Sequence, residues 1–411
     1  MKNLNFKIIK DGSVSSPEGF FADGIFAGLK SPGEDKLDLG VIFSEIECNW
    51  AATYTKNKVL SSSVDYCKEI SSKINGVIVN SGSANCCVGE QGLLDAKKIA
   101  NLIQKHASAK FHFLVSSTAD IGVEIPIGLI EQNIKRFDLS NKGGEKFSRA
   151  IITTDSKTKN IAVKVKSKSG DYVIGGVAKG SGMIHPKMGT MLGYITTDAK
   201  VSPVILTSII RDSVNQSFNQ IDVDGDTSTN DTVVIMSNGK SGVEIFHDND
   251  KDLFHEAVMF VSKFLAKQIA EDGEGITHLI TVNVEGAKTN EDAREVANTV
   301  VSSSLVKTAV YGKDPNWGRI MMSIGNSESY INKNKIKISI NGIQIAEDGK
   351  SISFHHQSVI SALNKFNVEI SIDLGESNGQ GMAWGSDLTE EYVIFNSAYT
   401  CLLYTSDAAD E

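Results

Sequence analysis

Short apolar runs that end in glycine-rich or polar turns restrict the fold of this chain more than any other feature. Three of them have the length and composition of strands: NGVIVNSG at 75–82, FHFLVSST at 111–118 and DTVVIMSNG at 231–239. Turns of this kind close β-strands, so we predict a strand at each place. Loops at strand ends commonly carry a protein's chemistry, so these turns are the first places to look for a site.

Helical patterns lie between and after the strands. Apolar residues recur at helical spacing in three segments, and the second follows a capping Ser202 and Pro203. The faces are Ala96, Ile99, Ala100 and Ile103; Leu206, Ile210, Val214 and Phe218; and Phe254, Val258, Val261, Leu265 and Ile269. This spacing is typical of amphipathic helices that bury one face.

Alternating apolar residues return late in the chain. The isoleucines at 336–340 lead into an Asn341-Gly342 turn and alternation resumes at 343–345 and at 368–374. This pattern predicts an antiparallel sheet, and residues 392–395 read as a terminal strand. With no repeat along the chain, we expect a two-lobed mixed α/β (α+β) fold in which sheets are layered with helices.

Composition narrows the class of partner. The chain has 411 residues and a formal net charge of -9, which would be repelled by nucleic acid and by anionic membranes. It has no run of about 18 apolar residues and no secretory signal pattern, so we expect a cytoplasmic protein that acts on a small molecule. The cysteines are expected to be free thiols: Cys48, Cys67, Cys86, Cys87 and Cys401.

Metal and phosphate motifs are incomplete. Asp222, Asp224 and Asp226 have the spacing of a calcium loop, but Thr227 replaces the required glycine and Val233 the closing glutamate. The SNGKSG segment at 237–242 lacks the earlier glycine of a phosphate loop, and the histidines lack zinc spacing. We therefore expect neither a metal nor a cofactor.

One segment carries a chemical possibility. In VAKGSGMIHPKMGTMLGYITTDA, at 177–199, the flexible Gly189 stands directly before Thr190. If Thr190 Oγ attacked the Gly189 carbonyl, water could open the resulting ester and leave Thr190 with a free α-amine as its own base. On composition alone, the alternative that Thr190 only opens a strand is the favoured one, because threonine favours strands.

Several long motifs spread along the chain favour the interpretation of Thr190 as a nucleophile. Besides KGSGMIHPKMGTML, they are NSGSANCCVGEQG at 80–92, VSSTADIG at 115–122, TTD at 153–155, VDGDTSTNDT at 223–232, DGEGIT at 272–277 and VKTAVYGKDPNWGRI at 306–320. From residue 1 to about residue 399 the chain resembles the ornithine acetyltransferase (glutamate N-acetyltransferase) family. The resemblance implies a self-cleaving fold of the kind shared with DmpA-type aminopeptidases.

The resemblance implies a role for each matching residue. Thr190 would accept acetyl from N-acetylornithine and pass it to glutamate, without a cofactor, although acetyl-CoA is a further donor in some members. Thr118 and the backbone N-H of Ala119 would stabilise the oxyanion. Substrate would be bound by Thr153, Lys179, Thr190, Glu274 and Asn396.

The resemblance also implies maturation into two chains, residues 1–189 and residues 190–400, assembled as α2β2. Cleavage between Gly189 and Thr190 would separate them. Residues 401–411 look foreign to the family, and we expect them to weaken substrate binding. Two rivals stay open: a related self-cleaving amidohydrolase or aminopeptidase, and an uncleaved binding protein without catalysis.

Two positions depart from the family pattern near the chemistry. Ala119 stands where glycine is usual, and its N-H keeps its direction if φ is negative there. Lys187 replaces a usual asparagine three residues before the expected cleavage point, so we expect it to change the cleavage rate without abolishing the chemistry.

Overall fold

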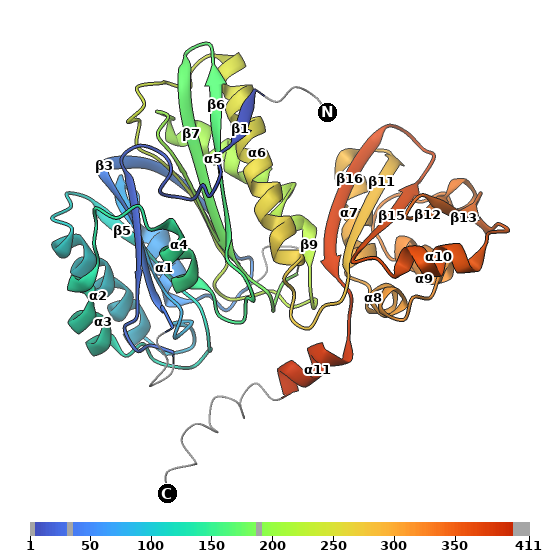
Figure 1. The fold of residues 1–411 in the computed structure, drawn as a ribbon, viewed down its shortest axis with the longest axis horizontal. Coiled ribbons are helices and arrows are strands. Elements are labelled where there is room, and N and C mark those ends of the chain that lie inside the picture. Colours follow the sequence, from blue (N-terminus) through green and yellow to red (C-terminus); the bar gives the residue numbers. More distant parts are fainter. Residues whose placement is uncertain (1–4, 31–35, 186–190, 398–411) are drawn as a thin grey trace, which may run out of the picture. The chain divides into compact units, whose positions relative to one another are not determined.

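The computed structural model describes residues 5–30, 36–185 and 191–397. The chain divides into two compact units (Figure 1). Unit 1 comprises Met1–Gly180, Lys187–Asn215 and Thr227–Leu265, and unit 2 comprises Ser181–Pro186, Gln216–Asp226 and Ala266–Glu411. The mixed α/β class and the two lobes expected from the sequence are confirmed.

Unit 1 is built on a sheet to which nine strands of the described chain contribute. The strands are β1 (Phe6–Ile8), β2 (Phe20–Ile25), β3 (Leu39–Tyr54), β4 (Ile74–Asn80), β5 (His112–Ser117), β6 (Lys159–Ser167), β7 (Gly170–Lys179), β8 (Leu192–Thr197) and β10 (Thr232–Ser237). Their order is β1-β6-β7-β8-β10-β3-β4-β5, and β2 also pairs with β3. Strands β8/β10 and β4/β5 are parallel, and the remaining pairs are antiparallel.

The long strand β3 connects two parts of this sheet. Its first residues pair with β2 and β4, and its last residues, from Asn49 to Tyr54, pair with β10. A register shift between Phe43 and Cys48 separates the two stretches of pairing with β4. Such irregularities bend a strand, so that β3 can pair with β2 and β4 at one end and with β10 at the other.

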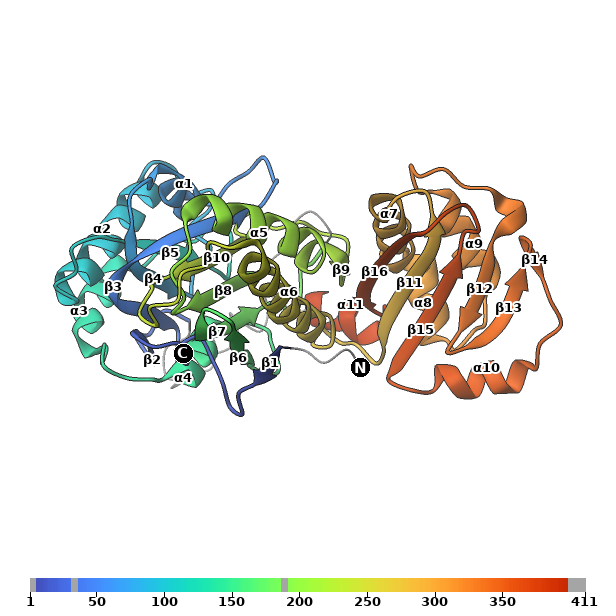
Figure 2. The ribbon, with the colours of Figure 1, turned by 90° about the horizontal axis from the view of Figure 1, so that it is seen from above.

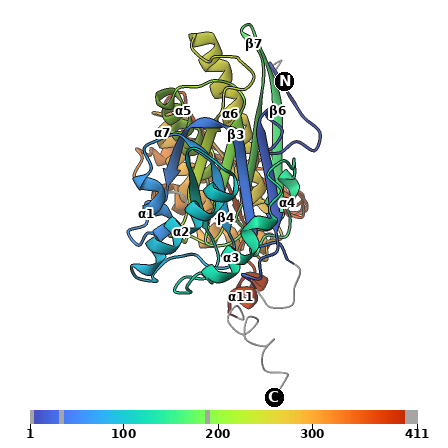
Figure 3. The same cartoon turned by 90° about the vertical axis from the view of Figure 1, so that its left-hand side faces the viewer.

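Helices cover both faces of the sheet. Helices α1 (Ser62–Glu69) and α2 (Gln91–His106) contact β5, and α3 (Ile127–Asn133) packs against α2 (Figure 3). Helix α5 (Pro203–Asn215) contacts β3 and β10. Helix α6 (Asp248–Ala270) covers β1 and β7, where Phe260 contacts Phe6 and Phe254 contacts Tyr172. Helix α4 (Gly144–Ile151) packs against β2 and β3.

Close approach of α4 to the sheet depends on glycine. A Cβ atom on Gly24 would lie 2.2 Å from the carbonyl oxygen of Lys146, and one on Gly40 would lie 2.9 Å from the Phe147 ring. The Phe147 ring then packs edge-on against Tyr194 of β8, with centroids 5.7 Å apart. Because α4 is held so closely, the segment that follows it, which includes Thr153 and Asp155, starts from a fixed position.

Unit 2 contains a second mixed sheet. Within the described residues it has seven strands in the order β14-β13-β12-β15-β11-β16-β9. Figure 2 shows β14 to β16 of this order side by side, and the short β9 pairs with β16. They are β9 (Ile221–Asp222), β11 (Leu279–Ala287), β12 (Lys337–Ile340), β13 (Ile343–Glu347), β14 (Lys350–Ser351), β15 (Asn367–Asp373) and β16 (Gly379–Ser386). Helices α7 (Asn290–Val301), α8 (Ser304–Tyr311), α9 (Trp317–Gly325) and α10 (His356–Leu363) accompany the sheet, and α11 (Glu390–Ser397) follows β16.

Most predicted elements are confirmed. The three early strands are β4, β5 and β10, the three helices are α2, α5 and α6, and the late hairpin is β12-β13. Phe218, assigned to the second helix, lies beyond it in a 3-10 turn. The predicted antiparallel pairing of the late strands is confirmed, because β12 pairs antiparallel with both β13 and β15, and β15 also pairs parallel with β11, a strand outside that prediction.

The predicted terminal strand at 392–395 is wrong, since these residues belong to helix α11. The hydroxyl of Thr389 accepts a hydrogen bond from the Tyr392 N-H (3.2 Å), and Glu390 and Glu391 occupy the first turn. This start, an oxygen cap followed by acidic residues, stabilises a helix and outweighs the strand preference of Tyr, Val, Ile and Phe. In the described chain, no helix is long and apolar enough to cross a membrane.

Candidate active site

Three residues implicated by the sequence meet in unit 1. Lys179, at the end of β7, donates hydrogen bonds to Thr153 Oγ1 (2.7 Å) and to Thr118 Oγ1 (3.3 Å). Thr118 follows β5, and Thr153 follows α4. Lys179 is 2% exposed. Because Lys179 fills an acceptor site on the Thr118 oxygen, the hydroxyl proton of Thr118 is free to point elsewhere.

Asp155 fixes this lysine from the other side. Its carboxylate accepts hydrogen bonds from Lys159 Nζ (2.6 Å) and from the Gly180 N-H (2.6 Å), and it forms an ion pair with Lys179 at 3.8 Å. It also accepts the N-H of Thr153 at 3.2 Å. One buried carboxylate therefore orients both Lys179 and Thr153.

The charges in this network shift the pKa of Asp155. Burial alone would raise it, but Lys179 and Lys159, with the hydrogen bonds from Lys159 and Gly180, lower the pKa to about 2. The nearby Lys30 has its pKa lowered to about 8, mainly by burial and also by repulsion from Lys179. The network therefore keeps Asp155 ionised at neutral pH.

Ala119 follows Thr118 with an unusual backbone conformation. The condition under which its N-H would keep its direction, a negative φ, is not met, because φ is +122°. The bonds on both sides impose it: the Thr118 N-H donates to Asn80 O (3.0 Å), and the Gly122 N-H donates to Cys86 O (2.9 Å). Alanine therefore occupies a conformation suited to glycine, the residue usual at this place in the family.

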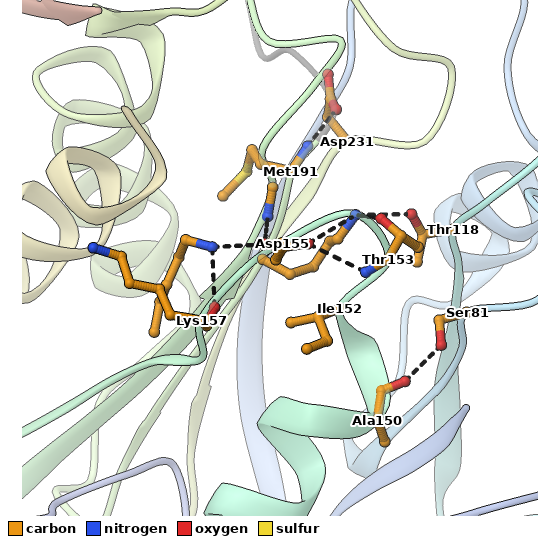
Figure 4. A network of polar contacts seen from close by, with 12 residues as sticks. Ser81, Thr118, Ala150, Ile152, Thr153, Asp155, Lys157, Met191 and Asp231 are labelled. Atoms are coloured by element: carbon orange, nitrogen blue, oxygen red, sulfur yellow. Dashed lines mark hydrogen bonds and ion pairs between the residues drawn. The ribbon is translucent and has the colours of Figure 1, made fainter. Parts of the chain in front are cut away.

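A second buried carboxyl group lies where β8 begins. Asp231 is 0% exposed, and its Oδ1 accepts the N-H of Met191 (2.9 Å), which immediately follows Thr190 in the sequence (Figure 4). Burial raises the pKa of Asp231 well above its ordinary value. Thr55 lies nearby but donates its hydroxyl to Ser228 O (2.6 Å), so among the described residues Asp231 Oδ2 has no hydrogen-bond partner. Asp231 is therefore a buried carboxyl group that anchors Met191, the residue directly before β8.

The other two implicated residues meet in unit 2. Asn396 of α11 donates to Glu274 Oε2 (3.1 Å) and to the Tyr392 carbonyl oxygen (3.1 Å). The Glu274 N-H donates to Ser181 O (3.1 Å), and a Cβ atom on Gly182 would lie 2.4 Å from the Glu274 carboxylate. The glycine of the KGSG motif thus lets this carboxylate lie against the backbone.

Unit 2 holds further buried charges. Asp222 forms ion pairs with Lys307 (2.9 Å) and His185 (2.9 Å). The contact between Asp222 Oδ2 and Lys307 is an ion pair without hydrogen-bond geometry. Lys307 donates its hydrogen bonds to three carbonyl oxygens instead. Asp224 accepts the N-H groups of Met183 and Ile184, and burial raises its pKa to about 6. These aspartates of the incomplete calcium loop hold the 183–185 segment. No group of three or more His, Cys, Asp or Glu in the described ranges is arranged for a metal ion.

Among the buried charged residues of the networks described above, sequence reasoning missed Asp155, Lys159, Asp231 and Lys307. All but Lys159 stand in motifs that the sequence analysis quoted. The signal was their position beside apolar strands or helix faces, where a charge needs a partner. Gly189 and Thr190 lie outside the described residues, as do Lys187 and residues 401–411.

Comparison with known proteins gives the family. The ArgJ family model matches residues 21–401. This chain belongs to the ArgJ family. The arginine biosynthesis bifunctional protein ArgJ of Oceanobacillus iheyensis is 42% identical over 398 residues, covering 95% of this chain and 97% of that protein. The protein of the same name from Bacillus cereus is 42% identical over 399 residues, with 95% and 97% covered.

A solved structure of a protein with that name, from Bacillus halodurans, is 42% identical and superposes with a TM-score of 0.49. It covers 50% of this chain and 98% of its own. The family match ends at residue 401, so residues 402–411 of this ArgJ family member lie beyond it.

Proposed function

We propose that this ArgJ family member is a glutamate N-acetyltransferase of arginine biosynthesis. It transfers acetyl from N2-acetylornithine to glutamate and returns ornithine. Because its relatives carry the name bifunctional protein, we also propose acetyl-CoA as a second acetyl donor. The proposal keeps the cytoplasmic location and the α2β2 assembly expected from the family resemblance.

Maturation begins with cleavage between Gly189 and Thr190. Thr190 Oγ attacks the Gly189 carbonyl carbon, the peptide C-N bond breaks, and an ester joins the two parts. Water then hydrolyses that ester and releases the Gly189 carboxylate and the Thr190 hydroxyl. The Thr190 amine freed in this way has an ordinary pKa of about 7.7–8.0, so its neutral form can accept a proton near neutral pH.

Acetyl transfer follows in two balanced steps. Thr190 Oγ attacks the acetyl carbonyl, its proton passes through the α-amine to the leaving nitrogen of ornithine, and acetyl-Thr190 remains. The amine of glutamate then attacks this ester, and its proton returns through the α-amine to Thr190 Oγ. The enzyme is regenerated without a cofactor.

The observation that supports this proposal most is the hydrogen bond from buried Lys179 to Thr118 Oγ1. It leaves the Thr118 hydroxyl as a donor and sets a positive charge beside it. Both features stabilise a negative oxygen in a place from which water is excluded. Thr118 is therefore the proposed side-chain donor to the oxyanion. The Ala119 N-H stays the proposed backbone donor on the family resemblance alone, because its φ of +122° departs from the negative value that would keep the direction of this N-H.

Substrate recognition is assigned to the same two groups of residues. Lys179 and Thr153 carry donors for the substrate carboxylate. The Glu274 carboxylate, oriented by Asn396, suits the ammonium group of the ornithine side chain.

The decisive experiment is the intact mass of the purified protein beside a Thr190→Ala variant, followed by an assay of transfer from N-acetylornithine to glutamate. We expect two fragments divided before Thr190 in the wild type, one uncleaved chain in the variant, and transfer only by the wild type. Thr190→Ser is the matched control, because it keeps a hydroxyl and should retain some cleavage and transfer.

Other outcomes identify the rivals. Cleavage with release of acetate and no dependence on glutamate would assign the chain to the hydrolases. A single wild-type species of 44.3 kDa that binds N-acetylornithine without turnover would assign it to the binding proteins.

A further inference from the structure

Two adjacent thiols lie in the loop between β4 and α2. The Sγ atoms of Cys86 and Cys87 are 3.7 Å apart. Cys87 is exposed and Cys86 is 0% exposed. The φ of Cys87 is +60°, in the left-handed region. The pair thus combines one thiol that solvent reaches with a second thiol already in contact with it.

The remaining described cysteines are protected. Cys48 and Cys67 are 0% and 1% exposed, and burial raises the pKa of each thiol to about 12. Cysteine oxidation proceeds through the thiolate at accessible sulfur. An oxidant that reaches this part of the chain therefore meets Cys87 first.

Backbone bonds connect the pair to the residues around Thr118. The carbonyl oxygen of Cys86 accepts the Gly122 N-H (2.9 Å), and the Ala84 N-H donates to Asp120 O (3.0 Å). Ser83 Oγ donates to Val123 O (2.6 Å), and Ser83 also forms a bridge with Thr118. A change of the peptide between Cys86 and Cys87 is therefore transmitted to residues 118–123.

We propose that Cys86 and Cys87 form a peroxide-sensitive modification site, where oxidation to a disulfide between neighbours loosens the loop that holds Thr118 and Ala119. Adjacent Cα atoms are only about 3.8 Å apart across a trans peptide, below the usual range for a disulfide. Closing the ring strains the peptide, and a strained disulfide is easily reduced. The modification is thus reversible.

The oxidation is balanced with hydrogen peroxide as the oxidant. The Cys87 thiolate attacks one peroxide oxygen, the O-O bond breaks, and hydroxide leaves a sulfenic acid on Cys87. The Cys86 sulfur then attacks that sulfenic sulfur, the S-O bond breaks, and the proton of Cys86 leaves with the oxygen as water. A thiol reductant reverses the change and is itself oxidised.

The test is peptide mass spectrometry on the reduced full chain after treatment with hydrogen peroxide and blocking of free thiols with N-ethylmaleimide. Trypsin releases both cysteines in one peptide, because residues 74–97 contain no lysine or arginine before Lys97. We expect this peptide to be two hydrogens lighter and unlabelled, and to take two labels once dithiothreitol has been added. A doubly labelled peptide after peroxide, or a link to another peptide, would overturn the proposal.

Two variants and one further measurement separate the steps. Cys86→Ser should stop at a sulfenic acid that dimedone traps, and Cys87→Ser should resist peroxide.

Hydrogen exchange at the Gly122 amide should become roughly tenfold faster in the oxidised wild type and recover on reduction, since one hydrogen bond is weakened. Unchanged exchange would refute the coupling to Thr118. None of these readouts needs acetyl transfer, so their failure is distinguishable from failure of the proposed function.

Discussion

The backbone conformation and the partners of some residues differ from what the neighbouring sequence suggests, and the φ of Ala119 is the clearest case. A sequence argument gives an alanine a negative φ, whereas hydrogen bonds from segments far along the chain impose +122°. Asp155 is similar in its contact with Lys179, which comes from β7, whereas its other partner, Lys159, is its i,i+4 neighbour in sequence. Local patterns cannot reveal either, since both depend on tertiary partners.

Ala119→Gly should stabilise the protein. Relief of the strained backbone contributes roughly 1–3 kcal/mol, and the greater freedom of glycine in the unfolded chain offsets up to about 1 kcal/mol of it. We expect a net gain of about 1 kcal/mol in urea unfolding. Ala84→Gly is the matched control and should destabilise, because Ala84 has no left-handed backbone to relieve. A loss in both variants would contradict the strain argument.

Lys159→Met and Lys179→Met form a matched pair. Each removes one buried partner of Asp155, so each should lower the free energy of unfolding by about 3 kcal/mol. Only Lys179 also contacts Thr118 and Thr153. In the folded fraction, Lys179→Met should therefore lower kcat by up to roughly 10²–10³, the typical effect of losing an oxyanion donor, because Thr118, the proposed donor, loses the charge beside it. Lys159→Met should change kcat far less. Equal losses would make both lysines structural.

Asp224 should make stability depend on pH. Burial raises its pKa to about 6, so the folded state binds this proton more tightly than the unfolded chain. The stabilisation is complete below about pH 3.9 and is lost as pH rises through 6. Asp224→Asn removes this dependence, so relative to wild type it should gain about 2–3 kcal/mol between pH 4 and pH 7.5. Urea unfolding at both pH values measures it, and a constant difference would rule it out.

At the scale of elements, periodicity predicted the strands β4, β5 and β10 and the helices α2, α5 and α6, because burial of one face sets their spacing. Strand pairing was less predictable. The parallel pairs β8/β10 and β11/β15 join segments separated by long stretches of chain, and nothing local encodes them. A strand was predicted in place of helix α11 because the residues at 392–395 favour strands, whereas the Thr389 cap and the acidic first turn that stabilise the helix lie before them.

Thr389→Ala should test the start of α11. The variant loses the oxygen that accepts the Tyr392 N-H and should cost about 1 kcal/mol of helix stability. Because Asn396 lies on this helix and orients Glu274, the KM for N-acetylornithine should rise roughly fivefold while kcat changes little. Thr389→Ser keeps the oxygen and should behave as wild type. An unchanged KM in the alanine variant would remove α11 from substrate binding.

At the scale of the whole molecule, the expected cleavage point does not separate the compact units. Strand β8, after Thr190, lies between β7, before it, and β10, and β10 also pairs with β3. Both expected chains therefore contribute strands to one sheet. The motifs predicted which residues belong to the candidate groups, but they did not predict that Thr118, Thr153 and Lys179 meet in unit 1 while Glu274 and Asn396 meet in unit 2, because these contacts depend on tertiary pairing.

After cleavage, the two fragments should stay together. A tag on the amino-terminal fragment should retain the other fragment through native purification at equal amounts, because β7/β8 and β3/β10 pairing and the shared core must be broken to separate them. Release should require a denaturant such as urea near the unfolding midpoint. Separation in native buffer would mean that cleavage dissolves the sheet.

The position of β10 between β8 and β3 also determines when the sheet can be completed during synthesis. On the ribosome, the pairing edge of β3 at residues 49–54 emerges long before its partner, residues 232–237 of β10. Until then, β3 presents an open edge to any other nascent chain, and so does β8 once it has paired with β7, a state prone to aggregation. Truncated messages that end before β10 would thus yield insoluble products, and a chaperone that shields strand edges would help this chain more than one that acts on the finished protein.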